Sequence, residues 1–128
     1  MLARHAQGDP SCVPMPIRMR LHAMDAWVRR ASILTDRAAV TAALRIGARA
    51  GRATVVDEVF YVFPNGAVTG VLVLAQSHLS IHTWPELALA NVDLLSYGDV
   101  DGDRVLRVIG EHLGAERVRV TCVPRSRG

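Results

Sequence analysis

Two serines, two histidines, a tryptophan and a glutamate fall within ten consecutive residues of this 128-residue sequence. The stretch reads Ser77-His78-Leu79-Ser80-Ile81-His82-Thr83-Trp84-Pro85-Glu86. Serine, histidine and glutamate side chains supply the nucleophiles and general bases of many enzymes, and histidine also binds metals. From the residues alone, three interpretations stay open: a metal site, a serine–histidine hydrolase, and a strand whose polar side chains hydrogen-bond their neighbours.

Residue spacing and motif patterns argue against the first two interpretations, the metal site and the serine–histidine hydrolase. If this stretch is a strand, His78 and His82 share a face but lie roughly 13 Å apart, because each residue adds about 3.3 Å. One metal ion cannot bridge that distance without a sharp bend, so no metal ligand is predicted. A hydrolase would use Ser77 or Ser80 as its nucleophile and His82 as its base, but the sequence lacks a Gly-x-Ser-x-Gly elbow.

Composition excludes several function classes. All fifteen basic residues are arginine, so no lysine can hold pyridoxal phosphate or complete a phosphate-binding loop. The net charge of +3 is scattered rather than gathered in a basic stripe with aromatic residues, and nucleic-acid binding is not predicted. Cys12 and Cys122 form no CxxC pair, so no structural zinc site is expected. There is no long apolar run or apolar signal core, which favours a cytoplasmic protein that does not bind membranes.

Hydrophobic patterns and turn residues predict the elements that position this stretch. Residues 1–16 are rich in proline and are interpreted as a flexible leader before a single domain over 17–128. Strands are predicted over 21–28, 54–63, 68–75, 78–84, 88–95 and 118–123, and helices from about 36 to 50 and from about 101 to 113. A Pro-Asn-Gly turn at 64–66 joins the second and third strands into a hairpin. This order favours an α+β fold, a two-layer sandwich with a mainly antiparallel sheet and helices on one face.

The run Ser-His-x-Ser-Ile-His-Thr-Trp-Pro-Glu, which begins at Ser77, resembles the signature of the prokaryotic S-adenosylmethionine decarboxylase proenzymes, a pyruvoyl-dependent family. The similarity extends upstream through Phe63 and the stretch 64–70, Pro-Asn-Gly-Ala-Val-Thr-Gly. Downstream it includes Asn-Val-Asp at 91–93 and Gly-Asp at 98–99, so that it covers roughly residues 21–123. The core of this motif is long and rare, whereas its flanks are less specific.

The resemblance implies that the chain cuts itself between Gln76 and Ser77. The Ser77 hydroxyl would attack the Gln76 carbonyl, and β-elimination followed by hydrolysis would convert Ser77 into a pyruvoyl cofactor. Thr69 occupies the position of the family's upstream hydroxyl residue, and His82 matches the histidine that helps elimination. The cofactor forms a Schiff base with the substrate amine and accepts electrons as carbon dioxide leaves.

Residues of the substrate site follow from the same resemblance. Phe63 and His82 would stack on the adenine, Glu86 would bond the ribose hydroxyls, and Trp84 would line the pocket. The implied reaction is decarboxylation of a small molecule, S-adenosylmethionine, for polyamine (spermidine) biosynthesis. Family members assemble as dimers of processed units, so a homodimer is expected.

Two positions depart from the family pattern. The family has glutamate before the serine, where this chain has Gln76, and this difference is expected to alter the rate of processing rather than to prevent it. The family's proton-donating cysteine is replaced by Tyr97, a weaker acid with a larger ring. The larger ring favours, as an alternative, a pyruvoyl-dependent decarboxylase of another amino acid, ornithine or arginine. A further alternative, of a different class, is an unprocessed paralogue without catalytic activity.

Overall fold

Buried and exposed side chains alternate along the strands, and this alternation gives the sheet one apolar face. In β1 (Met19–Val28), His22, Met24, Ala26 and Val28 are buried, while the side chains between them are partly exposed. The same period of two runs through the central strands, as expected for a sheet covered on one side.

The computed structural model describes residues 19–125. Its strands are β1 (Met19–Val28), β2 (Val55–Val62), β3 (Val68–Leu74), β4 (Ser77–Trp84), β5 (Leu89–Tyr97) and β6 (Ala115–Arg125). Its helices are α1 (Arg37–Ala50) and α2 (Gly102–His112), with short 3-10 helices η2 (Ala31–Thr35) and η3 (Pro85–Leu87). The sheet order is β2-β3-β4-β5-β1-β6, and every neighbouring pair is antiparallel.

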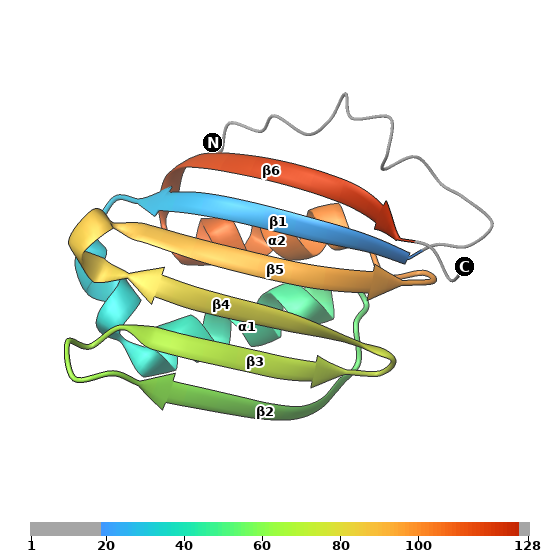
Figure 1. The fold of residues 1–128 in the computed structure, drawn as a ribbon, viewed down its shortest axis with the longest axis horizontal. Coiled ribbons are helices and arrows are strands. Elements are labelled where there is room, and N and C mark those ends of the chain that lie inside the picture. The colour runs from blue at the N-terminus through green and yellow to red at the C-terminus, as the bar shows by residue number, and fades with distance from the viewer. Residues whose placement is uncertain (1–18, 126–128) are drawn as a thin grey trace.

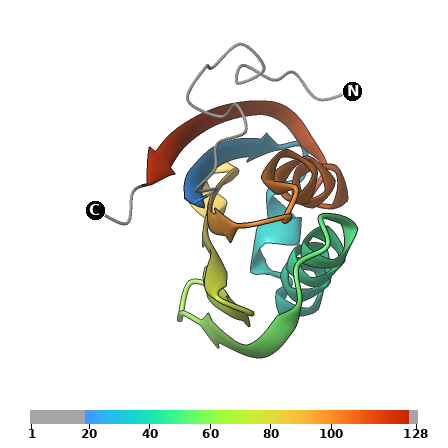
Figure 2. The same cartoon turned by 90° about the vertical axis from the view of Figure 1, so that its right-hand side faces the viewer.

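The two layers confirm the predicted α+β sandwich. Figure 1 looks onto the open sheet face with both helices behind it, and the side view in Figure 2 shows α1 and α2 on the same side of the sheet. The predicted strands and helices are all present, but β1, β5 and β6 extend further than predicted. All three pair as far as Met19, and β6 also begins earlier, where Ala115 pairs with Val28. The predicted leader, residues 1–16, lies outside the described residues.

Local capping residues set where the helices begin. Asp36 accepts a hydrogen bond from Ala39 N (3.1 Å) at the start of α1, and Asp101 accepts one from Arg104 N (3.1 Å) at the start of α2. The helices then approach closely at Gly47, where a Cβ atom would lie 2.5 Å from Ile109 Cγ1. Within residues 19–125, no helix has the length and apolar character needed to cross a bilayer.

A buried threonine ties η2 to the sheet. The Thr83 hydroxyl donates to the Leu34 carbonyl (2.8 Å) and accepts from the Val68 amide (2.8 Å). Thr83 is fully buried, so these bonds satisfy two backbone groups that have no access to water. They hold the segment before α1 against the ends of β3 and β4.

Candidate active site

The predicted site residues fall into two groups at opposite ends of β4. Ser77 begins the strand, whereas His82 and Trp84 lie at its other end. Five residues of strand separate Ser77 from His82 by about 16 Å, and the odd spacing turns the two side chains to opposite faces. Figure 1 shows the same separation, because the β3–β4 turn and the β2–β3 turn lie at opposite ends of the sheet.

The first group surrounds the expected cleavage bond. Ala75 and Gln76 form a two-residue turn between β3 and β4, closed by the pair Leu74–Ser77. Gln76 adopts the left-handed conformation, with φ of 67°, which few side-chain-bearing residues adopt. The Ser77 hydroxyl oxygen is buried and makes no hydrogen bond within residues 19–125. The bond after Gln76 therefore joins a left-handed residue to a serine whose hydroxyl is not engaged elsewhere.

Tyr97 belongs to this same end of the sheet. It is the last residue of β5, pairs with Met19 of β1 and is 40% exposed on the open face. The last ladder pair between β4 and β5 is His78–Leu95, and carrying that register two residues further sets Tyr97 opposite Gln76. Tyr97 thus lies beside the turn, although its side chain faces away from the helices while that of Ser77 faces toward them.

The second group is organised around His82. Thr69 and His82 are cross-strand partners, and Thr69 Oγ1 lies 2.6 Å from His82 Nδ1. Two aromatic rings meet the imidazole edge-on, Phe63 at 5.8 Å and Trp84 at 4.4 Å between ring centroids. The hydrogen bond fixes the orientation of the imidazole and leaves Nε2 as the ring nitrogen available for other contacts.

A hollow of about 380 Å³ opens beside this cluster. It is lined by Phe63, Pro64, Asn65, Ala67, His82, Trp84 and Glu86. Five of the predicted site residues therefore lie together here. Four of them line the hollow, namely Phe63, His82, Trp84 and Glu86, and the fifth, Thr69, contacts His82. Aromatic walls with one carboxylate suit a planar, polar ligand that carries positive charge.

A polar network that sequence reasoning missed continues from the hollow across the open face. Trp84 Nε1 donates to Asn91 Oδ1 (2.6 Å), and Asn91 Nδ2 donates to Asp25 Oδ1 (2.8 Å). Arg119 closes the network on the other Asp25 oxygen at 3.0 Å. The sequence signal that could have found this network is the two-residue period of strands, because each of these residues occupies an outward-facing position on its own strand.

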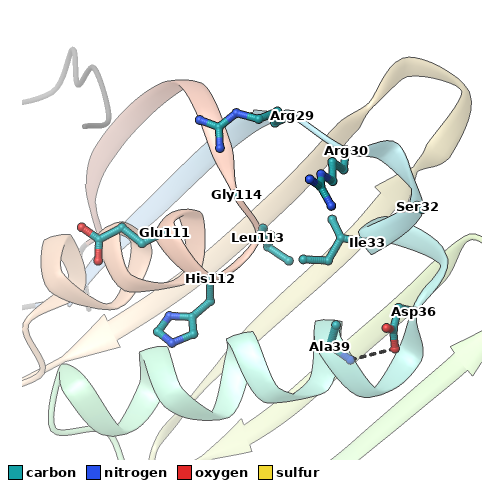
Figure 3. Close-up of a pocket in the computed structure, with 10 residues that line it drawn as sticks. All are labelled: Arg29, Arg30, Ser32, Ile33, Asp36, Ala39, Glu111, His112, Leu113 and Gly114. Atoms are coloured by element: carbon teal, nitrogen blue, oxygen red, sulfur yellow. Dashed lines mark hydrogen bonds between the residues drawn. The ribbon is translucent and has the colours of Figure 1, made fainter.

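A second hollow, of about 420 Å³, lies on the helix side, away from both groups. Figure 3 shows it between the turn after β1, the start of α1 and the end of α2. Its lining residues are Arg29, Arg30, Ser32, Ile33, Asp36, Ala39, Glu111, His112, Leu113 and Gly114. It contains none of the residues that the motif predicts.

Comparison with known proteins identifies relatives of this chain that share one family description. A family model described as S-adenosylmethionine decarboxylase matches residues 20–126. The S-adenosylmethionine decarboxylase proenzyme of Pseudomonas paraeruginosa is 43% identical over 82 residues, which are 63% of this chain and 51% of that protein. The proenzyme of the same name from Acidithiobacillus ferrooxidans is 39% identical over 88 residues, which are 68% of this chain and 66% of that protein.

The fold has a solved counterpart. The crystal structure of the adenosylmethionine decarboxylase from Aquifex aeolicus superposes with a TM-score of 0.76 at 25% identity, over 89% of this chain and 95% of that one. The chain spans about half the length of the Pseudomonas relatives that it matches, 51% of each.

Proposed function

Because this chain belongs to the S-adenosylmethionine decarboxylase family, we propose that it cuts itself and acts as a pyruvoyl-dependent decarboxylase of S-adenosylmethionine in the cytoplasm. The observation that carries the proposal is the conformation at residues 76 and 77. The family motif begins at a serine whose buried hydroxyl has no partner within the described residues and which follows a left-handed residue in a two-residue turn. Decarboxylation of this substrate would give a product that enters spermidine synthesis.

Self-cleavage would proceed through the chain's own atoms. Ser77 Oγ bonds to the Gln76 carbonyl carbon, the peptide C–N bond breaks, and the hydroxyl proton ends on the freed amine. The resulting ester loses the Ser77 α-proton and releases Gln76 as a carboxylate, which leaves dehydroalanine at position 77. Addition of water and loss of ammonia then give a pyruvoyl group. The left-handed conformation of Gln76 favours this sequence, because strain in the uncut turn is released when the bond breaks.

The surroundings of Ser77 suit the group that this chemistry would produce. Its hydroxyl oxygen is buried without a hydrogen-bond partner among the described residues. In the proposed reaction this oxygen leaves with Gln76 and the Ser77 Cβ becomes a methyl group, which removes an unsatisfied polar group from a buried position. The group would supply an electron-accepting carbonyl at a new amino terminus, which substitutes for the lysine-bound cofactor that this lysine-free chain cannot hold.

The hollow beside His82 is the proposed substrate pocket. Phe63 and His82, which meet edge-on at 5.8 Å between ring centroids, would have to move apart to take the adenine between them, and the Glu86 carboxylate would accept hydrogen bonds from the ribose hydroxyls. A sulfonium cation gains on the order of 0.5–2 kcal/mol beside an aromatic face such as Trp84. Thr69 would keep the imidazole in place through its hydrogen bond to Nδ1.

A homodimer would bring the two groups of residues together. Ser77 and His82 of one chain lie about 16 Å apart along β4 and so do not form one site within a single copy. A two-fold axis parallel to the open face and perpendicular to β4 would stack the open faces of two chains and set the Ser77 end of one against the His82 end of the other. Exposed apolar side chains on that face, among them Val59 (66%) and Val73 (44%), support such an interface. Cleavage would also free residue 77 from the register of β4.

A denaturing mass spectrum tests the proposal. The wild-type chain is expected to give two fragments, residues 1–76 and residues 77–128 with a modified first residue. Ser77→Ala should give one full-length chain, because it lacks the attacking hydroxyl. Ser80→Ala is the matched control, since it removes a serine of the same motif on the open face and should leave cleavage intact. An uncut wild-type chain without a carbonyl at residue 77, or two fragments from Ser77→Ala, would contradict the proposal.

Tyr97 supports a second candidate, a pyruvoyl-dependent decarboxylase of another amino acid such as ornithine or arginine. The tyrosine stands where the family has its proton-donating cysteine, and its ring would reduce the space for substrate. If Tyr97 is only a poor proton donor, Tyr97→Cys should raise carbon dioxide release from S-adenosylmethionine. Decarboxylation of ornithine and of arginine is assayed in parallel. If Tyr97→Cys leaves the rate on S-adenosylmethionine unchanged and the protein decarboxylates either amino acid, the second candidate is favoured.

A further inference from the structure

A histidine and a serine form a buried polar pair on the helix-facing side of the sheet. His22 Nε2 lies 3.0 Å from Ser96 Oγ, although the two residues are 74 positions apart in the sequence. The side chains are 4% and 1% exposed, and the substrate pocket around His82 uses neither of them. A buried imidazole bonded to a hydroxyl is a proton-accepting arrangement when the bonded ring nitrogen carries no hydrogen.

The strand register sets this pair beside the cleavage bond. The last ladder pair between β4 and β5 is His78–Leu95, and carrying that register one residue further sets Ser96 opposite Ser77. Both serines point to the helix side, as their burial shows. Opposed residues on one face of an antiparallel pair have Cβ atoms about 4.5–5.5 Å apart. A change of side-chain rotamer at Ser77 is then enough to bring its hydroxyl to Ser96 Oγ.

Helix α2 holds the imidazole in this position. Gly102, the first residue of α2, faces the ring so closely that a Cβ atom there would lie 2.3 Å from His22 Nε2. The ring is therefore confined between the helix and the sheet, with its Nε2 edge at Ser96.

We propose that Ser96 and His22 form a proton relay that activates Ser77 for self-cleavage. As Ser77 Oγ bonds to the Gln76 carbonyl carbon, its proton passes to Ser96 Oγ, and the Ser96 proton passes to His22 Nε2. The relay then runs in reverse and returns the proton to the Ser77 nitrogen as the peptide bond breaks. After the change of rotamer at Ser77, Ser96 would contact the reacting hydroxyl directly, whereas His22 acts through Ser96 as a positioning and proton-holding residue. This inference rests on the proposed self-cleavage.

The test is a time course of fragment formation in newly synthesised full-length protein. Ser96→Ala and His22→Gln should each slow cleavage about 100-fold, in the range by which general acid–base groups act. Glutamine can keep a hydrogen bond to Ser96 but cannot hold the proton. Ser96→Thr retains a hydroxyl and should restore cleavage to within a few-fold of wild type. Thr83→Val is the matched control, because it removes a buried hydroxyl at the far end of β4.

Hydroxylamine separates this role from a structural one, since it cuts an ester at Ser77 but leaves an unrearranged peptide bond after Gln76 intact. Only fragments that end at residue 76 or begin at residue 77 are counted, because hydroxylamine also cuts Asn65–Gly66, which gives fragments of different mass. Folded His22→Gln, checked by circular dichroism, should give no fragments with hydroxylamine, because the ester does not form. Fragments released by hydroxylamine, cleavage of His22→Gln at the wild-type rate, or equal slowing by Ser96→Thr and Ser96→Ala would overturn the relay alone. A wild-type chain that is never cut would overturn the proposed function and the relay together.

Discussion

Gln76 carries the backbone conformation on which self-cleavage is proposed to depend. Its φ of 67° places a residue with a side chain in the left-handed region, at a cost of about 1 kcal/mol relative to a right-handed conformation. The carbonyl of this residue is the one that Ser77 would attack. Any part of that cost that is released in the transition state lowers the barrier to cleavage.

Replacement of this residue by glycine tests the role of strain. Gln76→Gly should slow cleavage about fivefold, because glycine adopts the left-handed region freely and about 1 kcal/mol of ground-state strain is lost. Gln76→Glu keeps the left-handed residue and its strain, so any change in its cleavage rate reports the side-chain charge rather than the backbone conformation. The rate of appearance of the 77–128 fragment is the measurement, and a glycine variant that cleaves as fast as wild type would show that the strain does not contribute.

At the residue level the sequence predicted side chains that the structure gathers around His82, but not that Ser77 lies apart from them. The motif assigned Ser77 and His82 to one reaction, but their odd spacing on a strand already required opposite faces. Applied to this pair, the strand period would have revealed the separation. The pairing of His22 with Ser96 had no such signal, because it depends on the register of β1 against β5, and that register is set by packing of distant segments.

Among the secondary-structure elements, helix α2 is the one that connects the overall fold to the proposed relay. Its start near residue 101 was predicted from the sequence, as was the start of α1 near residue 36, because N-cap residues such as Asp101 and Asp36 are local signals. The close contact of Gly102 with His22 was not predictable, because it depends on how far the helix lies from the sheet. The full extents of β5 and β6 were missed for a similar reason, since a strand ends where its partner ends.

Gly102→Ala should displace the His22 ring and slow cleavage about tenfold in folded protein, as weakened general acid–base assistance would. Gly47→Ala is the matched control, because its Cβ would collide with Ile109 just as closely but far from the relay. Both variants should unfold at lower denaturant concentration, and only Gly102→Ala should lose cleavage rate. Equal rates in the two folded variants would argue against a role for this contact.

For the molecule as a whole, the sequence predicted the two-layer class but not the order of the strands. Alternating hydrophobic residues define strands and their buried faces, whereas the position of β1 between β5 and β6 is set by contacts across the whole chain. The same global arrangement separates Ser77 from His82, and it is the reason that a second copy is proposed to complete the site.

Complementation tests this arrangement. Ser77→Ala and His82→Ala should each be inactive alone, but co-expression in equal amounts should restore about a quarter of the wild-type activity. Half of the dimers would then be mixed, and each mixed dimer would hold one intact site. Carbon dioxide release from S-adenosylmethionine is the measurement. No recovery, with mixed dimers verified by differently tagged chains, would indicate that each copy works alone.

The sheet order also determines what happens to a chain cut after Gln76. The first fragment would hold β1, β2 and β3 and the second β4, β5 and β6, yet β1 lies between β5 and β6. The fragments would be interleaved, so that neither could leave without breaking ladders on both sides of β1. The nicked protein should therefore persist as one unit, but its refolding would become a bimolecular reaction whose yield falls on dilution.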